Sequence, residues 1–234
     1  MKIKFASYNI HKAVGLDRRR DHERILRILR EVDADVVALQ EVDRRFGRRM
    51  AVLPLDAIHE TTDYEPVPMS MKPDSLGWHG NALLVRRGIE LVEAAPVPLP
   101  VLEPRGAVRA DLMAEGQCFR VIGMHLDLSG LRRRHQIRSV LSHVADCNED
   151  YPTVMLGDFN EWALHGGCFR EFDEKWRVLA PGRSFPSRRP IAFLDRIVVS
   201  KQWEVLAADV HHSSTAAVGS DHLPVFASLK LPEN

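Results

Sequence analysis

The same order of secondary structure elements is predicted twice along this chain, and that repetition restricts the fold more than any other feature. In the first unit, residues 3–10 form a predicted strand, residues 21–33 a helix and residues 35–43 a second strand with the apolar run 36-VVAL-39. The helix is indicated by apolar residues at helical spacing after a plausible N-cap at Asp21; they are Ile25, Ile28, Leu29 and Val32.

The second unit has a predicted strand at 118–129, a helix at 131–147 and a strand at 153–158. Its helix carries an apolar face of Ile137, Val140, Leu141 and Val144. Strand, helix and strand in this order predict an α/β layer arrangement. Polar residues follow the buried strands of both units, at the carboxyl ends where open α/β sheets build their sites.

The rest of the chain adds strands but no boundary. Further strands are predicted at 80–88 and 106–113, separated by the Pro-rich segment 95–104, and at 193–200 and 223–231. An amphipathic segment near 168–176 and a Pro/Ser/Arg loop at 181–190 lie between them. Because no low-complexity tract or shift in composition divides the chain, we expect a single domain over residues 1–234.

The charge balance excludes some functions. Lys plus Arg and Asp plus Glu both number 32, so no overall charge draws the protein to nucleic acid or an anionic membrane. Arginines cluster at 18–20, 132–134 and 188–189. Each cluster could bind phosphate or could simply form solvated surface, and solvated surface is the favoured interpretation. Three cysteines without CxxC spacing indicate a reducing cytoplasm. We expect no signal peptide and no stable membrane insertion, and no obligate protein partner is evident.

Polar side chains recur where buried strands stop: Asn9, Glu41, His125, Asp158, Asn160, Asp195, Asp221 and His222. Each has an ordinary alternative, such as a helix cap at Asp158 or a core histidine at His125. Together, however, these carboxylates would repel one another without a compensating cation. Oxygen ligands without thiolates favour Mg²⁺ or Mn²⁺, which commonly bridge protein carboxylates and phosphate.

The motifs 8-YNI-10, 40-QE-41, 125-HL-126, 157-GDFN-160, 195-DRI-197 and 220-SDHLP-224 resemble the endonuclease/exonuclease/phosphatase superfamily, which includes DNase I-like and exonuclease III-like metal-dependent phosphoesterases. The segment 183–197 resembles small bacterial members. The resemblance covers positions 8 to 224. It implies a four-layered α/β sandwich, in which two mixed β-sheets pack face to face with helices outside.

The resemblance also implies a role for each site residue. Glu41 is the expected main metal ligand, assisted by Asn9 and Asp221. Asp158 would orient or deprotonate the attacking water, and Asn160 would hold a phosphate oxygen. His222, polarised by Asp195, would stabilise charge or act as the base, and the choice between Asp158 and His222 stays open. His125 would contact the scissile phosphate or protonate the leaving oxygen, and Asn81 and Arg105 are expected substrate contacts; for Asn81 a strand-start role is equally supported.

The expected function is therefore a Mg²⁺- or Mn²⁺-dependent hydrolase that cleaves a phosphoester, with a diester favoured over a monoester. The substrate, whether nucleic acid, phospholipid headgroup or small phosphorylated metabolite, is not set by these motifs. Trp162 could stack a base or a headgroup, or could simply pack. The alternative is a phosphate-binding module without catalysis. The presence of Glu41, Asp158, Asp195 and His222 together favours the enzyme.

Overall fold

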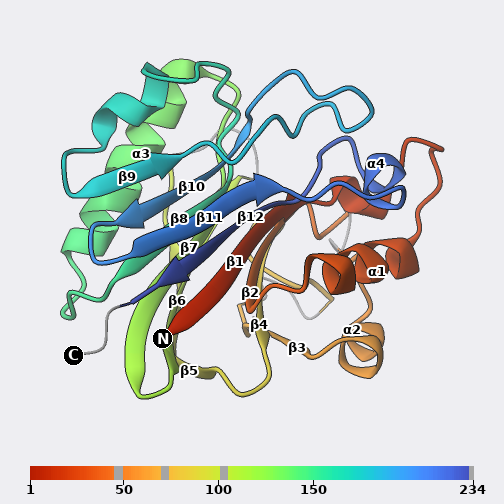
Figure 1. Cartoon of the computed structure of the whole chain (residues 1–234), viewed down its shortest axis with the longest axis horizontal. Coiled ribbons are helices and arrows are strands. Elements are labelled where there is room, and N and C mark those ends of the chain that lie inside the picture. The colour runs from red at the N-terminus through yellow and green to blue at the C-terminus, as the bar shows by residue number, and fades with distance from the viewer. Residues whose placement is uncertain (45–49, 70–73, 101–104, 232–234) are drawn as a thin grey trace.

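The computed structural model describes residues 1–44, 50–69, 74–100 and 105–231, and they contain both strands and helices (Figure 1). The strands are β1 Lys2–Asn9, β2 Val36–Gln40, β3 Tyr64–Pro66, β4 Asn81–Arg86, β5 Glu90–Val97, β6 Gly106–Ala114, β7 Gln117–His125, β8 Thr153–Asp158, β9 Trp176–Leu179, β10 Asp195–Ser200, β11 Glu204–Val210 and β12 Val225–Lys230. The helices are α1 His22–Val32, α2 Leu55–Thr61, α3 Gly130–Ala145 and α4 Ala216–Gly219, with 3₁₀ turns η1 His11–Ala13 and η2 Gly167–Glu171.

The first predicted unit is confirmed. The side chain of Asp21 accepts a hydrogen bond from the backbone N–H of Arg24 at 3.0 Å, which caps α1. The four apolar residues predicted for its inner face are all buried. Helix α1 connects β1 to β2, and these strands pair in parallel from Phe5 opposite Val36 to Asn9 opposite Gln40.

The second unit is also confirmed, with α3 connecting the parallel strands β7 and β8. Ile137 and Val140 are completely buried, whereas Leu141 and Val144 are half-buried against the same cluster. Below α3, Phe159 and Phe169 pack with ring centroids 5.7 Å apart. This second apolar cluster fills the layer between α3 and its sheet.

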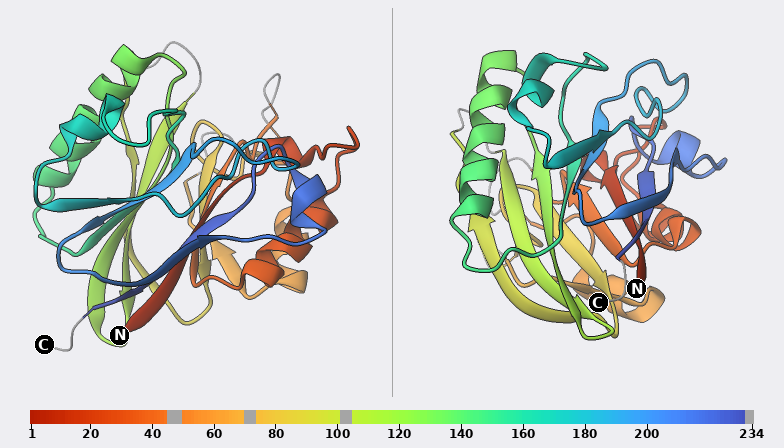
Figure 2. Two further views of the ribbon diagram at one scale, coloured as in Figure 1. Left: turned by 45° about the horizontal axis from the view of Figure 1, so that its top comes forward. Right: turned by 60° about the vertical axis from the view of Figure 1, so that its left-hand side comes forward.

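Within the described ranges the strands form two six-stranded mixed sheets, in the orders β11-β12-β1-β2-β4-β3 and β5-β6-β7-β8-β10-β9. They pack face to face, with α1 and α2 outside the first sheet and α3 outside the second (Figure 2). Between the sheets, Phe5, Phe119 and Trp203 meet edge to face at 5.4–5.9 Å. The predicted four-layered sandwich is therefore correct. No helix in the described part of the chain has the length and apolarity needed to cross a bilayer.

Some outer elements differ from the expectation. The Pro-rich segment predicted to separate two strands begins inside β5, and its residues 101–104 lie outside the described ranges. The segment 168–176 is divided between η2 and the start of β9. Strand β5 is exposed over most of its length and so lacks the buried alternation by which a strand is recognised in sequence.

Candidate active site

Two rows of polar residues meet at one end of the sandwich. In the first sheet, Asn9 is the register partner of Gln40 at the ends of β1 and β2. In the second sheet, Asp158 is the register partner of both His125 and Asp195. Side-chain Nδ2 of Asn9 donates to Oδ2 of Asp158 at 3.1 Å, which joins the two rows across the sandwich. Strand register within each sheet and the packing of the two sheets therefore bring these predicted residues together.

Asp158 is presented by an unusual backbone at the end of β8. A Cβ on Gly157 would lie 1.8 Å from the carbonyl oxygen of Met124, so only glycine permits this approach to β7. Oδ1 of Asp158 accepts from the backbone N–H of Asn160 at 2.9 Å, and Asn160 has a left-handed φ of 50°. The Asn160 amide donates to the carbonyl of Leu126 at 2.9 Å. Asn160 thereby ties the end of β8 to that of β7.

His222 is held between two carboxylates. Its Nδ1 lies 2.8 Å from Oδ2 of Asp195, and its Nε2 lies 3.7 Å from Oδ2 of Asp158. Ser184 donates to the same Asp195 oxygen at 2.5 Å. Burial lowers the pKa of His222, but Asp195 and then Asp158 outweigh burial and raise this pKa to about 10. The imidazolium form is therefore the stable one at neutral pH.

His125 lies on the other side of the same carboxylate, with Nε2 3.4 Å from Oδ2 of Asp158. Arg105 contacts this ring nitrogen and donates to the carbonyl of Leu126 at 2.7 Å. Burial lowers the pKa of His125 to about 3; Asp158 opposes the shift and Arg105 adds to it. Asp158 is thus flanked by two histidines of opposite protonation state, a cation at His222 and a neutral ring at His125.

Lys12 is a site residue that the sequence reasoning missed. Its ammonium group forms an ion pair with the carboxylate of Glu41. His11, Lys12 and Ala13 all have left-handed φ values, 45°, 58° and 58°, and Glu41 has 59°. Strained backbone of this kind is typical of functional sites. Because no glycine or asparagine marks the turn, no local signal in the sequence indicates it.

The turn that carries Lys12 is attached to the end of β2. The backbone N–H of Ile10 donates to the carbonyl of Gln40 at 3.1 Å, and that of Lys12 donates to the carbonyl of Glu41 at 3.2 Å. The parallel pairing of β1 with β2 is thus extended beyond the strands themselves. This attachment fixes the Lys12 side chain beside Glu41.

The expected metal ligands fit a hard divalent cation in their chemistry. Glu41 offers a carboxylate that already binds the Lys12 ammonium. Asn9 offers its amide oxygen, which among the described contacts accepts only the backbone N–H of His11, at 3.1 Å. In the part of the chain that the structure describes, no three His, Cys, Asp or Glu side chains form a complete metal cage. Mg²⁺ does not require one, since it commonly binds one or two carboxylates, waters and a substrate phosphate.

The remaining predicted residues are less central. The side chain of Asp221 is 35% exposed, with Oδ1 3.9 Å from Nδ1 of His11. Asn81 is the first residue of β4 and is almost fully buried, and its amide lies 3.4 Å from the carbonyls of Trp78 and His79. This geometry matches the strand-start role of Asn81. Asp127, which is not among the predicted site residues, accepts the N–H of Ser129 at 2.8 Å in the turn before α3.

One arginine differs from the expectation of a solvated surface. Arg133 is buried, donates to Glu161 at 3.1 Å and to the carbonyl of Leu128 at 2.6 Å, and so connects α3 to the loop after β8. The favoured prediction for the 132–134 cluster is wrong at this position, because a buried acid requires the charge. Arg188 and Arg189 are exposed, in accord with the prediction.

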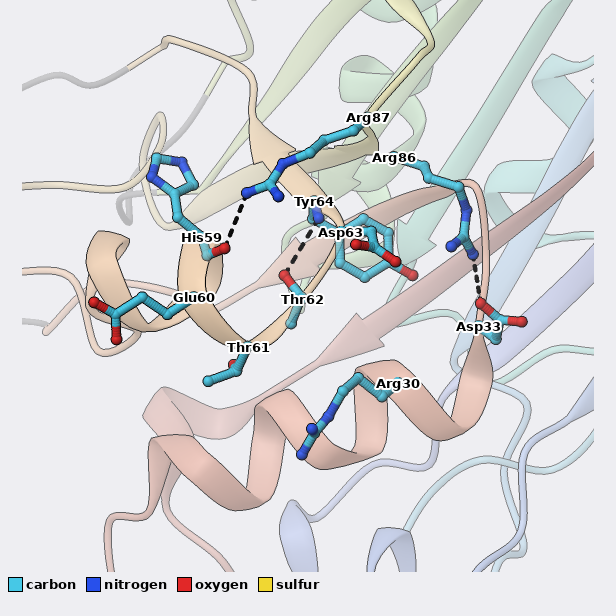
Figure 3. A pocket seen from close by; sticks show the side chains of 10 residues that line it. All are labelled: Arg30, Asp33, His59, Glu60, Thr61, Thr62, Asp63, Tyr64, Arg86 and Arg87. Atoms are coloured by element: carbon cyan, nitrogen blue, oxygen red, sulfur yellow. Dashed lines mark hydrogen bonds and ion pairs between the residues drawn. The ribbon is translucent and has the colours of Figure 1, made fainter.

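A separate polar hollow of about 300 Å³ lies at the opposite end of the first sheet, where β2 begins and β4 ends (Figure 3). Arg86 donates there to Asp33 at 2.5 Å, and Arg87 donates to the carbonyl of His59 at 2.9 Å. These bonds join α1 and α2 to β4. The hollow contains none of the residues predicted for the active site.

A two-sheet sandwich with this site at one end defines the DNase I-like class of phosphoester hydrolases. The chain belongs to the Endonuclease/Exonuclease/phosphatase family, which it matches over residues 6–222. The predicted superfamily is therefore confirmed.

Three known proteins show how far the similarity of this chain extends. The uncharacterized protein YbhP of Escherichia coli K12 is 29% identical over 249 residues, which cover 98% of this chain and 96% of that protein. An endonuclease/exonuclease/phosphatase from Bacteroides vulgatus has a TM-score of 0.78 at 17% identity, covering 99% of this chain and 100% of that one. The human Nocturnin catalytic domain with bound sulfate has a TM-score of 0.75 at 20% identity, covering 99% and 95%. Both structural likenesses show the fold.

Proposed function

We propose that the protein is a Mg²⁺- or Mn²⁺-dependent hydrolase that cleaves a phosphodiester by in-line attack of water. The observation that carries this proposal is the environment of Asp158, whose carboxylate meets the Asn9 amide at 3.1 Å, His125 at 3.4 Å and His222 at 3.7 Å. A carboxylate in this position can accept a proton from water. A neighbouring cation can offset charge that develops on the phosphate.

In the proposed step, Asp158 orients the water and takes its proton while the water oxygen forms a bond to phosphorus. The bond from phosphorus to the leaving oxygen breaks, and that oxygen takes up a proton from solvent water. His222, fixed by Asp195 at 2.8 Å, donates from Nε2 to a non-bridging phosphate oxygen. This assignment favours Asp158 as the base, because Nδ1 of His222 is already engaged with Asp195 and the ring is cationic.

In this proposal the other side chains contact the leaving group, the phosphate or the metal ion. His125, neutral and in contact with Arg105, faces the leaving group, and Arg105 adds positive charge beside it. Asn160 contributes a phosphate contact. Glu41 with Asn9 would hold the divalent cation, and Asp221 remains a predicted further ligand. When bound, such a cation polarises the phosphoryl oxygens and activates water.

Lys12 fits the same scheme as a second cationic group. Its ammonium pairs with Glu41, and its charge adds to the lowering of the pKa of His125. If a divalent cation were held at Glu41, the Lys12 ammonium would be available to a phosphate oxygen. We also keep the single domain over 1–234, the cytoplasmic location and the lack of an obligate protein partner as predictions.

The experiment is hydrolysis of bis(p-nitrophenyl) phosphate with Mg²⁺ or Mn²⁺. Asp158→Ala and His222→Ala are each expected to lose at least about 100-fold in rate while folding normally, since general acid-base groups typically contribute about 10²–10⁴-fold. The matched controls Glu204→Ala and His212→Ala, both at exposed positions, should retain full rate. EDTA and Glu41→Ala should abolish turnover.

Two results would contradict the scheme. Near-wild-type rates in both Asp158→Ala and His222→Ala would contradict the proposed roles of these residues. Turnover insensitive to EDTA would contradict the proposed dependence on a metal ion. A wild-type protein that binds phosphate but hydrolyses neither diester nor monoester would instead be a binding module.

A further inference from the structure

The most exposed large apolar side chains lie in loops and at the start of α3, at the active-site end of the second sheet. They are Leu128 at 66%, Leu131 at 71%, Trp162 at 62% and Ile191 at 61%. In the rest of the described chain, no exposed large apolar residue exceeds 50%. Single exposed apolar residues are ordinary, but four at this level in neighbouring segments indicate a binding surface. We call these four residues the apolar rim.

Hydrogen bonds and a ring contact join the segments that carry the apolar rim. Arg133 donates both to the carbonyl of Leu128 and to Glu161, which precedes Trp162. The Trp162 ring lies 6.3 Å from that of Phe185, edge to face. The carbonyl of Phe185 accepts the N–H of Ile191 at 2.9 Å. The start of α3 and the loops after β8 and β9 lie together at one end of the molecule in both views of Figure 2.

The rim is also adjacent to the proposed chemistry. The Phe185 ring lies 4.9 Å from that of His222, and Asn160 donates to the carbonyl of Leu126, two residues before Leu128. A partner that covers the rim therefore lies over the mouth of the active site.

The exposed charges of these segments are positive. Within residues 126–136, 159–167 and 181–194 the acids are Asp127, which is 8% exposed, and Glu161, which is 5% exposed and paired with Arg133. Arg188 and Arg189 are exposed, directly before Pro190 and Ile191, and neither has an ion pair among the described residues. The apolar rim is thus accompanied by unpaired positive charge, which complements an anionic partner.

We infer that the rim docks the protein on an anionic phospholipid bilayer, so that the ester offered to the site is that of a lipid headgroup. The substrate part of this inference rests on the proposed function. Aliphatic side chains insert into the boundary of headgroups and acyl chains, tryptophan favours that boundary, and arginines attract anionic lipids. Single-stranded nucleic acid would instead need a series of aromatic platforms, whereas three of the four rim residues are aliphatic.

The test is sedimentation with phosphatidylcholine vesicles, with and without phosphatidylglycerol, in Mg²⁺. The wild type should bind the anionic vesicles and bind the neutral ones more weakly. Leu131→Ser with Ile191→Ser should weaken binding at least about tenfold through lost apolar burial. Arg188→Gln with Arg189→Gln should weaken it about 30-fold, from the attraction of each arginine to an anionic surface.

A matched control separates docking from general stickiness. Leu206 on β11 is 43% exposed and lies outside the three segments, so Leu206→Ser should leave binding unchanged. Thermal unfolding should confirm that all variants fold. Absence of wild-type vesicle binding, an equal loss in Leu206→Ser, or binding of single-stranded DNA or RNA in place of vesicles would overturn the inference.

These experiments distinguish a failure of the docking inference from a failure of the proposed function. Asp158→Ala should bind anionic vesicles as tightly as the wild type while releasing no headgroup. Vesicle binding by a wild type that hydrolyses no phosphoester would contradict the proposed function but not the docking surface. Hydrolysis of bis(p-nitrophenyl) phosphate without vesicle binding would contradict docking alone.

Discussion

Replacing Asp195 with asparagine tests the electrostatics of the site most directly. Asp195 is completely buried, and one of its oxygens accepts from both His222 and Ser184. Asparagine keeps the shape but leaves the nearly buried His222 cation without its main counter-ion. Breaking a buried pair from one side costs about 3–5 kcal/mol. We expect the lower end, about 3 kcal/mol, because Asp158 remains 3.7 Å from the ring.

The assay is urea unfolding at neutral pH, with hydrolysis of bis(p-nitrophenyl) phosphate measured beside it. The rate should fall about 10²–10⁴-fold, because His222 loses both its orientation and its charge. Ser184→Ala is the control: it removes a hydrogen bond to the same oxygen but no charge, so it should cost about 1.5–3 kcal/mol and leave His222 oriented. If Asp195→Asn unfolds within about 0.5 kcal/mol of the wild type and keeps its rate, the reasoning is refuted.

Two further predictions concern the other charged groups. Lys12→Met should tighten Mg²⁺ binding roughly threefold, because the ammonium no longer competes for Glu41, and it should slow hydrolysis. Calorimetry without substrate measures the Mg²⁺ affinity, and an unchanged affinity would exclude this competition. His125 has its pKa lowered from 6.5 to about 3, so its contribution to stability is complete above pH 6.5 and is lost as the pH falls toward 3. Unfolding free energies measured from pH 7 to about pH 4 should therefore fall less steeply in His125→Asn, and equal slopes would count against a buried neutral ring.

Much of the fold was predictable because its central elements carry strong patterns. Helix α1 has an N-cap and an apolar face, and β2 and β8 are continuous apolar runs, so burial is encoded locally. The edge strands β5 and β11 carry no such pattern, since most of their residues face solvent. The order of strands in each sheet is also absent from local patterns, because distant segments such as β1 and β12 pair with each other.

The site divides in the same way. The residues at strand ends were predictable because a polar side chain such as Asp158 or His125 at the end of a buried apolar strand indicates a functional site. Lys12 was not, because it follows from a left-handed turn that no glycine signals. Arg133 was misjudged because a run of three arginines does not reveal which one turns inward to meet Glu161.

The bond from Asn9 to Asp158 has a consequence for how activity arises during folding. Asn9 ends β1 and Glu41 directly follows β2 in the first sheet, whereas His125, Asp158 and Asp195 lie in strands of the second, so neither sheet alone holds a complete set of groups. A chain with only one sheet formed has half of the chemistry and cannot act on the phosphoesters around it. Turnover therefore requires both sheets to be formed and packed against each other.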